Sequence, residues 1–198
     1  MKKVLVAVLL LAGVCSANVA AESGKWEVGG GPGYSMPVGG DWSDAVGGSF
    51  NLNAFGAYKI QDPLAVGLEL GYDFSHKAKD TAIYDMSDVK TKIFQVTPFV
   101  KASKDMTMSG KKVNYYGIFG AGLYSMSTSG STTPLLAGAQ VVDETASAGY
   151  FGFNLGGGAT MELAPQWSVG LDLRWHHIFS SNAATNNITP TLKVAYMF

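Results

Sequence analysis

The chain has 198 residues, a formal net charge of −1 and 15% charged residues, whereas about a quarter of the residues in an ordinary soluble domain are charged. Glycine, with 25 residues, and aromatic residues, at 12%, are both abundant. A mildly acidic chain offers no electrostatic basis for nucleic-acid binding, so we exclude nucleic acid as a partner.

An apolar run from Val4 to Val14 follows two lysines at the N-terminus. It is too short to span a bilayer, but it has the length of the hydrophobic region of a signal peptide. The small residues Val19-Ala20-Ala21 then precede Glu22 and fit a cleavage site. The sequence therefore predicts a signal peptide over residues 1–21 and export of a mature chain that begins at Glu22.

Cys15 is the one cysteine of the chain. A lipoprotein site would use this residue, but the bulky Val14 stands where that site prefers Gly or Ala. We expect Cys15 to be removed with the signal peptide, which leaves no disulfide and no zinc-thiolate site in the mature chain. Loss of Lys2 and Lys3 also lowers the formal net charge from −1 to −3.

Eight segments downstream of Glu22 alternate apolar residues with small or polar ones, as strands with one apolar face do. The third segment is the most regular, because every second residue from Leu64 to Phe74 is apolar. No mature stretch approaches the ~18 apolar residues of a transmembrane helix, so a membrane span must consist of strands. The predicted strands are Trp26–Tyr34, Phe50–Lys59, Leu64–Ser75, Thr91–Val100, Val113–Tyr124, Phe151–Glu162, Trp167–Phe179 and Thr191–Phe198.

The predicted connections alternate in length. Short turns follow the second, fourth and sixth strands, at Gln61-Asp62-Pro63, Ser103–Gly110 and Ala164-Pro165-Gln166. Long polar loops follow the first, third, fifth and seventh strands. The first of these loops ends at about Gly48, and the other three span His76–Asp88, Ser125 to about Ala148, and Ser180–Ile188. This asymmetry predicts long loops outside the cell and both termini in the periplasm. In the longest loop, we expect the apolar patch Pro134-Leu135-Leu136 to fold over the barrel mouth.

Aromatic residues gather at both ends of the predicted strands, as amphipathic rings do at the two membrane interfaces. The periplasmic set is Trp26, Tyr58, Trp167, Tyr196 and Phe198, and the outer set is Tyr34, Phe50, Tyr72, Phe74, Phe94, Phe151, Trp175 and Phe179. We therefore predict an all-β fold, an eight-stranded antiparallel up-and-down transmembrane β-barrel over residues 22–198. A soluble barrel of the lipocalin or streptavidin type would exchange the two faces, but eight strands leave little interior room for the large rings.

The signal peptide, the eight strands, the loop asymmetry and the ending Val194-Ala195-Tyr196-Met197-Phe198 together resemble the small outer-membrane barrels of the OmpA, OmpX and OmpW kind. The resemblance implies a place in the cell outer membrane, contact with its lipids including lipopolysaccharide, and recognition of the last strand by the barrel assembly machinery. Members serve in wall anchoring, adhesion, passage of small apolar molecules or lipid modification. We expect a monomer without a peptidoglycan-binding domain, whose outer loops serve surface interaction or envelope integrity.

The predicted inward face carries nine charged residues: Glu27, Lys59, Glu69, Asp73, Lys101, Glu162, Asp172, Arg174 and Lys193. Opposite charges in a confined lumen pair, because an isolated ion is costly to desolvate, so we expect a salt-bridge network that fills the lumen. A narrow channel for small solutes or apolar molecules is the alternative, supported by inward glycines that leave volume unfilled. On the same pattern, Leu68→Arg should harm insertion far more than Gly67→Ser.

The stretch from Trp175 to Asn182 is loosely similar to lipid A deacylase barrels, in which a His and a Ser two residues apart act with a downstream Glu. Here Ser180 lies three residues after His177 and so points to the opposite face, and no Glu follows Asn182. We therefore predict no catalytic residue and no enzymatic activity. The histidines, His76, His176 and His177, lack a ligand spacing and a nearby carboxylate, so we predict neither a metal nor a cofactor.

Overall fold

The computed structural model describes residues 26–80, 84–86, 88–134, 142–180 and 184–198. The predicted signal peptide over residues 1–21 and the predicted mouth-covering residues Leu135 and Leu136 lie outside these ranges. Within them, no helix is long and apolar enough to cross a membrane. A short helix, α2 (Gly40–Ala45), follows the first strand.

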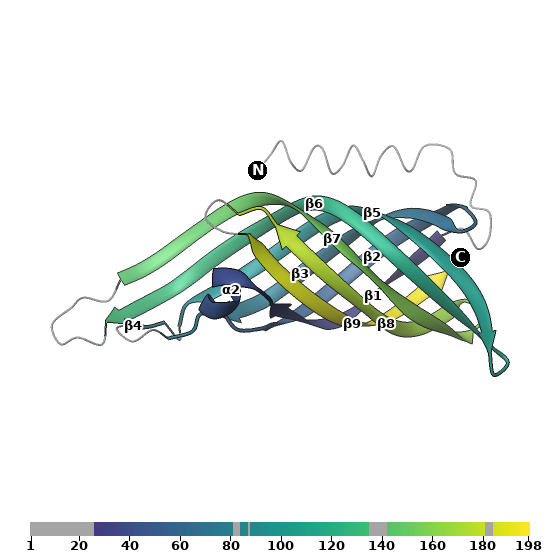
Figure 1. Ribbon diagram of the computed structural model, residues 1–198, viewed down its shortest axis with the longest axis horizontal. Helices are drawn as coiled ribbons and strands as arrows, with labels where there is room; N and C mark the ends of the chain where they lie inside the picture. The colour runs from purple at the N-terminus through teal and green to yellow at the C-terminus, as the bar shows by residue number, and fades with distance from the viewer. Residues whose placement is uncertain (1–25, 81–83, 87, 135–141, 181–183) are drawn as a thin grey trace.

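The described residues form antiparallel strands in an up-and-down order (Figure 1). Eight long strands make one closed sheet, in which each strand pairs with its neighbours along the chain and the last pairs with the first. The two-residue β4 extends the edge of β6. The strands are β1 (Trp26–Pro37), β2 (Ser49–Gln61), β3 (Leu64–Lys77), β4 (Tyr84–Asp85), β5 (Lys90–Met108), β6 (Lys111–Pro134), β7 (Val142–Ala164), β8 (Trp167–Ile178) and β9 (Thr185–Met197). The predicted eight-stranded barrel is confirmed.

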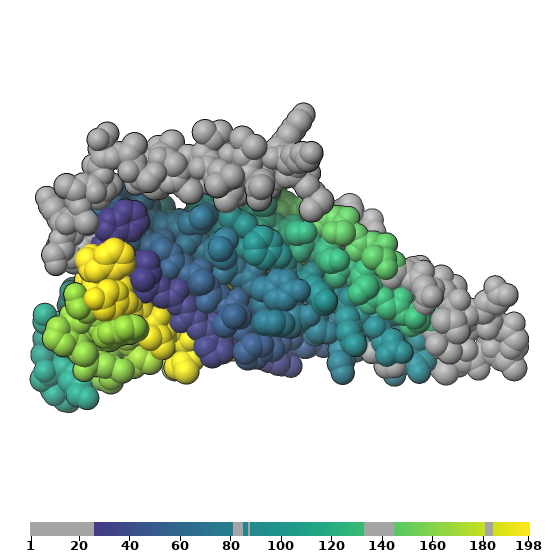
Figure 2. All heavy atoms as spheres, turned by 180° about the vertical axis from the view of Figure 1, so that it is seen from behind, coloured from purple at the N-terminus to yellow at the C-terminus, as the bar shows by residue number. Residues whose placement is uncertain are grey.

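The barrel closes where β1 meets β9. The backbone amide of Trp26 donates to the carbonyl oxygen of Phe198 at 3.1 Å, and the amide of Phe198 donates back at 2.9 Å. The surfaces of the two strands adjoin in the space-filling view, purple beside yellow (Figure 2). Closure satisfies the backbone groups that an open edge would leave unpaired, which a lipid environment requires.

The two faces of the wall differ as the alternation predicts. On β3, Val66, Leu70 and Phe74 expose 37–43% of their surface, and Ala65 and Glu69 expose 6% and 4%. The apolar side chains therefore point outward and the polar ones point into the lumen. This is the arrangement of a membrane barrel rather than of a soluble barrel with exchanged faces.

Aromatic contacts mark both rims of the barrel. At the rim where β1 begins and β9 ends, ring centroids lie 5.1 Å apart in the Trp26–Tyr58 pair and 4.9 Å apart in the Trp167–Tyr196 pair. At the other end, the distances are 5.5 Å for Phe50–Phe74 and 6.2 Å for Phe151–Phe179. The rings occupy the two rims where the sequence pattern places aromatic girdles.

Three short turns lie at the rim where β1 begins and β9 ends. Each contains two residues: Asp62-Pro63, Ser109-Gly110 and Pro165-Gln166. The predicted turn over Ser103–Gly110 was too long, because β5 continues to Met108 and pairs there with Lys111. Ser109 and Gly110 have φ values of 51° and 78°. Two successive residues with positive φ suit a tight hairpin whose twist matches that of its strands.

The prediction of a long loop from Ser125 to about Ala148 was also wrong. β6 runs to Pro134, β7 begins at Val142, and the two strands stay in register out to the pair Thr132↔Val142. The resulting hairpin projects well past the barrel (Figure 1). Its Ser, Thr and Gly residues carry no alternating apolar face, so the pattern of a strand is absent although the backbone ladder continues. In the same way, β9 begins at Thr185, inside the predicted loop Ser180–Ile188.

Candidate functional site

An ion-pair cluster crosses the middle of the lumen. The guanidinium of Arg174 on β8 lies 3.1 Å from the carboxylate of Glu69 on β3 and 2.7 Å from that of Asp172. Gln95 donates a further hydrogen bond to Glu69 at 3.2 Å. The two acids and Arg174 are each at most 5% exposed, so every charge finds its partner inside the barrel. This cluster is the salt-bridge network that the inward charges predict.

Lys193 extends this network, and its ammonium group contacts no carboxylate within the described residues. Its ammonium group lies 4.0 Å from the centroid of the Phe55 ring and 4.7 Å from that of Tyr116, and it donates to the Tyr116 hydroxyl at 3.3 Å. That hydroxyl donates in turn to Asp172 at 2.7 Å. Tyr116 therefore links a cation held by ring faces to the ion-pair cluster.

A cavity of about 630 Å³ opens at the rim that holds the two-residue turns. Glu27 and Lys101 form an ion pair in its lining, and Lys59, Lys104 and Glu162 also line it. We call this cavity the vestibule. This volume is far larger than the roughly 10–15 Å³ that one water molecule needs, so water enters the lumen from this side.

Polar side chains line the lumen at the end opposite the two-residue turns, which we call the outer end. Asn51 donates to Asp73 at 2.5 Å, and His76 lies 3.1 Å from the other carboxylate oxygen of Asp73. The Tyr124 hydroxyl lies 3.2 Å from Nδ1 of His176. The cavity left between these groups measures about 10 Å³, which is at most room for one water molecule.

The connection between β1 and β2 covers the outer mouth. The indole N–H of Trp42 on α2 donates to Asn187 on β9 at 2.9 Å, and the Trp42 ring lies 5.6 Å from that of His76. Trp42 also packs on the buried cluster of Ile93, Tyr124 and Ile178. We call α2 with Trp42 the outer cap. Among the described residues, the outer cap thus obstructs the lumen at the outer end, and the vestibule opens toward the turns.

The inward glycines do not leave open space, because rings from neighbouring strands fill it. A Cβ atom at Gly67 would lie 2.5 Å from the Phe99 ring, and one at Gly29 would lie 2.7 Å from the Phe55 ring. These rings, with Ile118 and two alanines, form a buried apolar layer. The observation that supported a channel therefore supports a packed interior instead.

Most of the predicted inward charges meet in the lumen, and two do not. Lys59 pairs with Asp62 in the adjacent turn rather than across the barrel. Glu162 is exposed at the rim of the vestibule. Both residues lie near the end of their strands, where an inward side chain reaches water, so neither needs a partner deep in the lumen.

On β8, the residues His176 and His177 face opposite sides. His176 is 6% exposed and points into the lumen, while His177 lies outside among the rings of Phe153, Trp175 and Phe179. Nδ1 of His177 is 2.7 Å from the side-chain oxygen of Asn186. The register between β7 and β8 has no bulge at this end. Asn182 lies outside the described residues.

Ser180 lies beyond the end of β8, where its hydroxyl is 3.4 Å from that of Thr185. Thr185 is 3% exposed and faces the lumen. The Ser180 hydroxyl therefore turns toward the lumen side, opposite to His177, as the three-residue spacing predicts. A nucleophile and its base must lie within hydrogen-bond reach, which this geometry does not offer.

The prediction that the histidines lack a nearby carboxylate was wrong for His76, which is 3.1 Å from Asp73. The other ring nitrogen of His76 is 2.8 Å from the carbonyl oxygen of Gly47. Both nitrogens are thus engaged by the protein. Among the described residues, no group of three or more His, Cys, Asp or Glu side chains is arranged to hold a metal ion.

The sequence pattern did not single out three rings that shape the lumen: Phe55, Phe99 and Trp42. Phe55 shares the parity of Asn51 and Asn53, so strict alternation alone places it inside. Phe99 follows from the same rule on β5. Trp42 has no such signal, because it lies on α2 in the connection between β1 and β2, whose position depends on contacts with β3 and β9.

Comparison with known proteins agrees with this architecture. Residues 6–198 match the family described as outer membrane protein beta-barrel domain. No curated protein sequence matches the chain.

Several solved outer-membrane barrels are similar in fold. Neisserial surface protein A has a TM-score of 0.58 at 14% identity, over 90% of this chain and 100% of that one. Ail, the attachment invasion locus protein of Yersinia pestis, was crystallised with the heparin analogue sucrose octasulfate and gives 0.53 at 16%, over 89% and 100%. OprG from Pseudomonas aeruginosa gives 0.54 at 12%, over 89% and 97%. At identities this low, the structural similarity shows a shared fold and nothing more about the chain.

Proposed function

The chain belongs to the outer membrane protein beta-barrel domain family, and from this we propose that it is a non-enzymatic outer-membrane protein that binds extended segments of external partners. The observation that carries the proposal is the outer part of the β6–β7 hairpin, residues 125–134 and 142–150, which projects past the barrel (Figure 1). We call it the outer hairpin. The barrel anchors the outer hairpin to the membrane, and the proposed binding surface lies beyond the membrane.

The edge of β7 away from β6 supports this role. β7 pairs with β8 only as far as Gly152↔Ile178, and the amide of Phe179 still donates to Phe151 at 2.9 Å. Across the described part of the chain, residues 142–150 pair only with β6. An unpaired edge offers backbone donors and acceptors to an added strand, which gives affinity with little demand on partner sequence.

Solute passage is the second candidate, and the interior opposes it. A solute that entered the vestibule would have to displace the Arg174–Glu69 pair and then the outer cap. Breaking a buried ion pair is strongly unfavourable, by about 3–5 kcal/mol. We therefore infer a closed barrel at rest.

Export and assembly complete the proposal. We infer that residues 1–21 direct export, that β9 presents the final strand to the barrel assembly machinery, and that the protein works as a monomer. The outward face of the barrel is apolar, and its exposed rings would aggregate in water before insertion. The chain therefore needs the assembly machinery.

The test compares cells that display the full chain with cells that display a shortened hairpin. Thr128 pairs with Ala146, so replacing residues 129–145 by Asn-Gly closes the hairpin with a tight turn. We expect intact cells to bind an immobilised panel of extracellular proteins, and the shortened variant to lose that binding while it still folds. Equal binding by both would refute the surface role. Conductance steps from the reconstituted full chain would favour the channel instead.

A further inference from the structure

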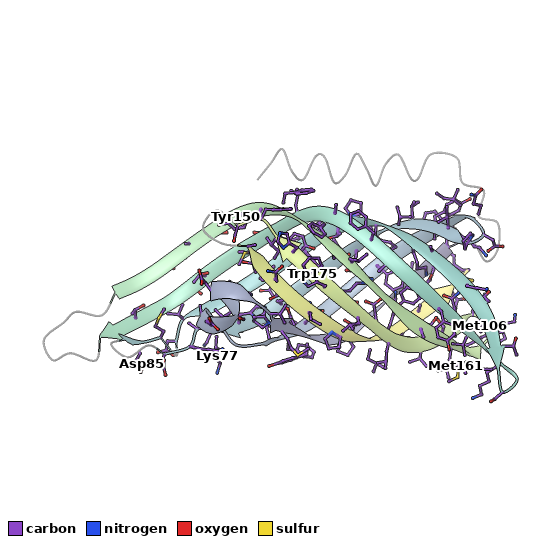
Figure 3. All side chains as sticks on the ribbon, viewed as in Figure 1. Lys77, Asp85, Met106, Tyr150, Met161 and Trp175 are labelled. Atoms are coloured by element: carbon purple, nitrogen blue, oxygen red, sulfur yellow. The ribbon has the colours of Figure 1, made fainter. Side chains whose placement is uncertain are left out.

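Three methionines gather on the outward face of the barrel beside the turn between β5 and β6. Met106 on β5 stands opposite Val113 on β6, and Val113 stands opposite Met161 on β7, so the two methionines flank one valine. Met108 follows two residues after Met106 on the same face of β5. Figure 3 labels Met106 and Met161 close to each other at this end of the barrel. We call Met106, Met108 and Met161 the methionine cluster.

Water reaches the methionine cluster from the side of the two-residue turns. Met106 and Met108 expose 51% and 53% of their surface. They lie on the part of β5 that continues past Ala102, which pairs with the first residue of β3. Met161 is half-buried and points outward, because Thr160 before it is buried and faces the lumen. An ion on this side of the membrane can therefore reach all three sulfur atoms.

A hydrogen bond holds the sulfur of Met108 over the centre of the cluster. The Tyr115 hydroxyl donates to this sulfur at 3.0 Å. Tyr115 lies two residues after Val113 on β6, and Met108 stands opposite Lys111, two residues before Val113. The contact between Tyr115 and Met108 therefore bridges Val113, the residue that the other two methionines flank.

The spacing of the strands lets the other two sulfur atoms approach the same point. Neighbouring strands lie about 4.8 Å apart, so about 10 Å separates the backbones of Met106 and Met161 across β6. Methionine is unbranched and has three rotatable bonds, so its sulfur adapts readily to a shared ligand. Val113 between them is short. Three thioether sulfurs can thus surround one ion held over Val113.

The chemistry of the cluster selects a soft ion of low charge. Thioether sulfur is a soft donor that suits Cu(I), whereas Mg²⁺, Ca²⁺ and Mn²⁺ prefer oxygen ligands. Three neutral donors do not compensate a high metal charge. Lys104 and Lys111 stand on the same face, opposite Tyr115 and Met108, and their charges repel a divalent ion twice as strongly as a monovalent one. The sequence argument against a metal concerned histidines, which such a site does not need.

We propose that the methionine cluster binds one Cu(I) ion through the thioether sulfurs of Met106, Met108 and Met161. Tyr115 is a positioning residue, because its hydroxyl fixes the sulfur of Met108 rather than contacting the ion. The ion arrives and leaves as Cu(I), so binding involves no redox step. The inference goes beyond the proposed function and does not require the outer hairpin to bind any partner.

The experiment measures Cu(I) uptake by the full chain in nanodiscs, through anaerobic equilibrium dialysis against Cu(I) stabilised by acetonitrile. Empty nanodiscs give the background. The test variant carries M106L, M108L and M161L, because leucine keeps an apolar side chain of similar volume. Heat-dependent gel migration confirms folding. X-ray absorption at the copper edge identifies the ligand atoms, which should be sulfur.

The control variant carries M36L, M86L and M197L, an equal loss of thioethers from other parts of the chain. Changes to residues that only support a metal ligand already lower metal affinity by about 10–100-fold. We therefore expect the test variant to lose affinity for Cu(I) by at least about 100-fold, and the control to bind as the natural chain does.

Three results would overturn the proposal: uptake by the natural chain no greater than that of empty nanodiscs, equal affinity in the two triple variants, or Zn(II) uptake as strong as that of Cu(I). If the test variant fails to fold, M108L alone decides, with an expected loss of about tenfold or more. Tyr115→Phe keeps all three sulfurs and removes the hydrogen bond to Met108, so it should lower the affinity less than M108L does.

Discussion

The guanidinium of Arg174 on β8 lies 3.1 Å from the carboxylate of Glu69 on β3, so this ion pair spans the lumen. Asp172 holds the same guanidinium at 2.7 Å. Arg174 therefore compensates two buried acids. We expect Arg174→Met to lower the free energy of unfolding by about 3–5 kcal/mol, because it leaves two buried carboxylates unpaired.

Glu69→Gln is the matched comparison, since Arg174 keeps Asp172 in that variant. Its effect should stay near 1–3 kcal/mol, the range for a weakened buried hydrogen bond. Urea titration in micelles, read by heat-dependent gel migration, measures both. Similar losses in the two variants would mean that the cluster does not depend on Arg174.

Gly67→Ala should destabilise the barrel, whereas the sequence predicts only that a small side chain at Gly67 is milder than an arginine at Leu68. A Cβ there would lie 2.4 Å from the carbonyl oxygen of Gly56 and 2.5 Å from the Phe99 ring. Gly56→Ala is the control, because a Cβ at Gly56 meets no atom within 4 Å. We expect a loss of about 1–3 kcal/mol for the first and none for the second, by the same urea titration.

Leu68→Arg tests the depth of the outward face. Leu68 lies on β3 between the rings at the two rims and stands opposite Gly56. A charged side chain near the midplane of a barrel costs about 2–4 kcal/mol. Unfolding from lipid vesicles should reveal that loss, and Leu68→Ile should show little. A small effect of arginine would place Leu68 near an interface instead.

Trp42→Ala should loosen the outer cap without unfolding the barrel. The change removes the hydrogen bond to Asn187 and the ring contact with His76. Trp42→Phe keeps a ring but not the N–H donor. We expect faster amide hydrogen exchange around β9 Asn187 in the alanine variant and an intermediate rate with phenylalanine. Unchanged exchange in both would show that the cap does not shield this end of the lumen.

Cells that express the protein should keep lipid A with its full set of acyl chains. His177 faces the aromatic rings outside, while the Ser180 hydroxyl approaches Thr185. A hydrolase needs these groups in contact. Mass spectra of lipid A with and without expression give the measurement, and a lost acyl chain that returns with His177→Ala would overturn the non-enzymatic assignment.

Sequence alternation was sufficient for the wall, because burial on one face repeats every two residues. Leu64 to Phe74 is the clearest instance, and it forms β3 in the expected register. The ion pairs of Arg174 also follow from inward parity. Alternation could not reveal the outer hairpin, whose residues have no apolar face, and its length comes from backbone pairing alone.

The packing of side chains in the lumen could not be predicted from the sequence, for a different reason. Whether Gly67 leaves a void depends on Phe99, a residue on the neighbouring strand in the sheet. Likewise, Trp42 reaches Asn187 across 145 positions of sequence. Such contacts depend on three-dimensional register, which no local pattern contains.

The vestibule also shapes the electric field across the membrane. A membrane potential falls where the dielectric constant is low, and water in the vestibule extends the potential of that side of the membrane into the barrel. The drop is therefore compressed from the ~30 Å of the hydrocarbon core into the packed layer around Arg174 and Tyr116. Those charges experience most of any voltage, at about 2.3 kcal/mol per elementary charge per 100 mV for the full drop.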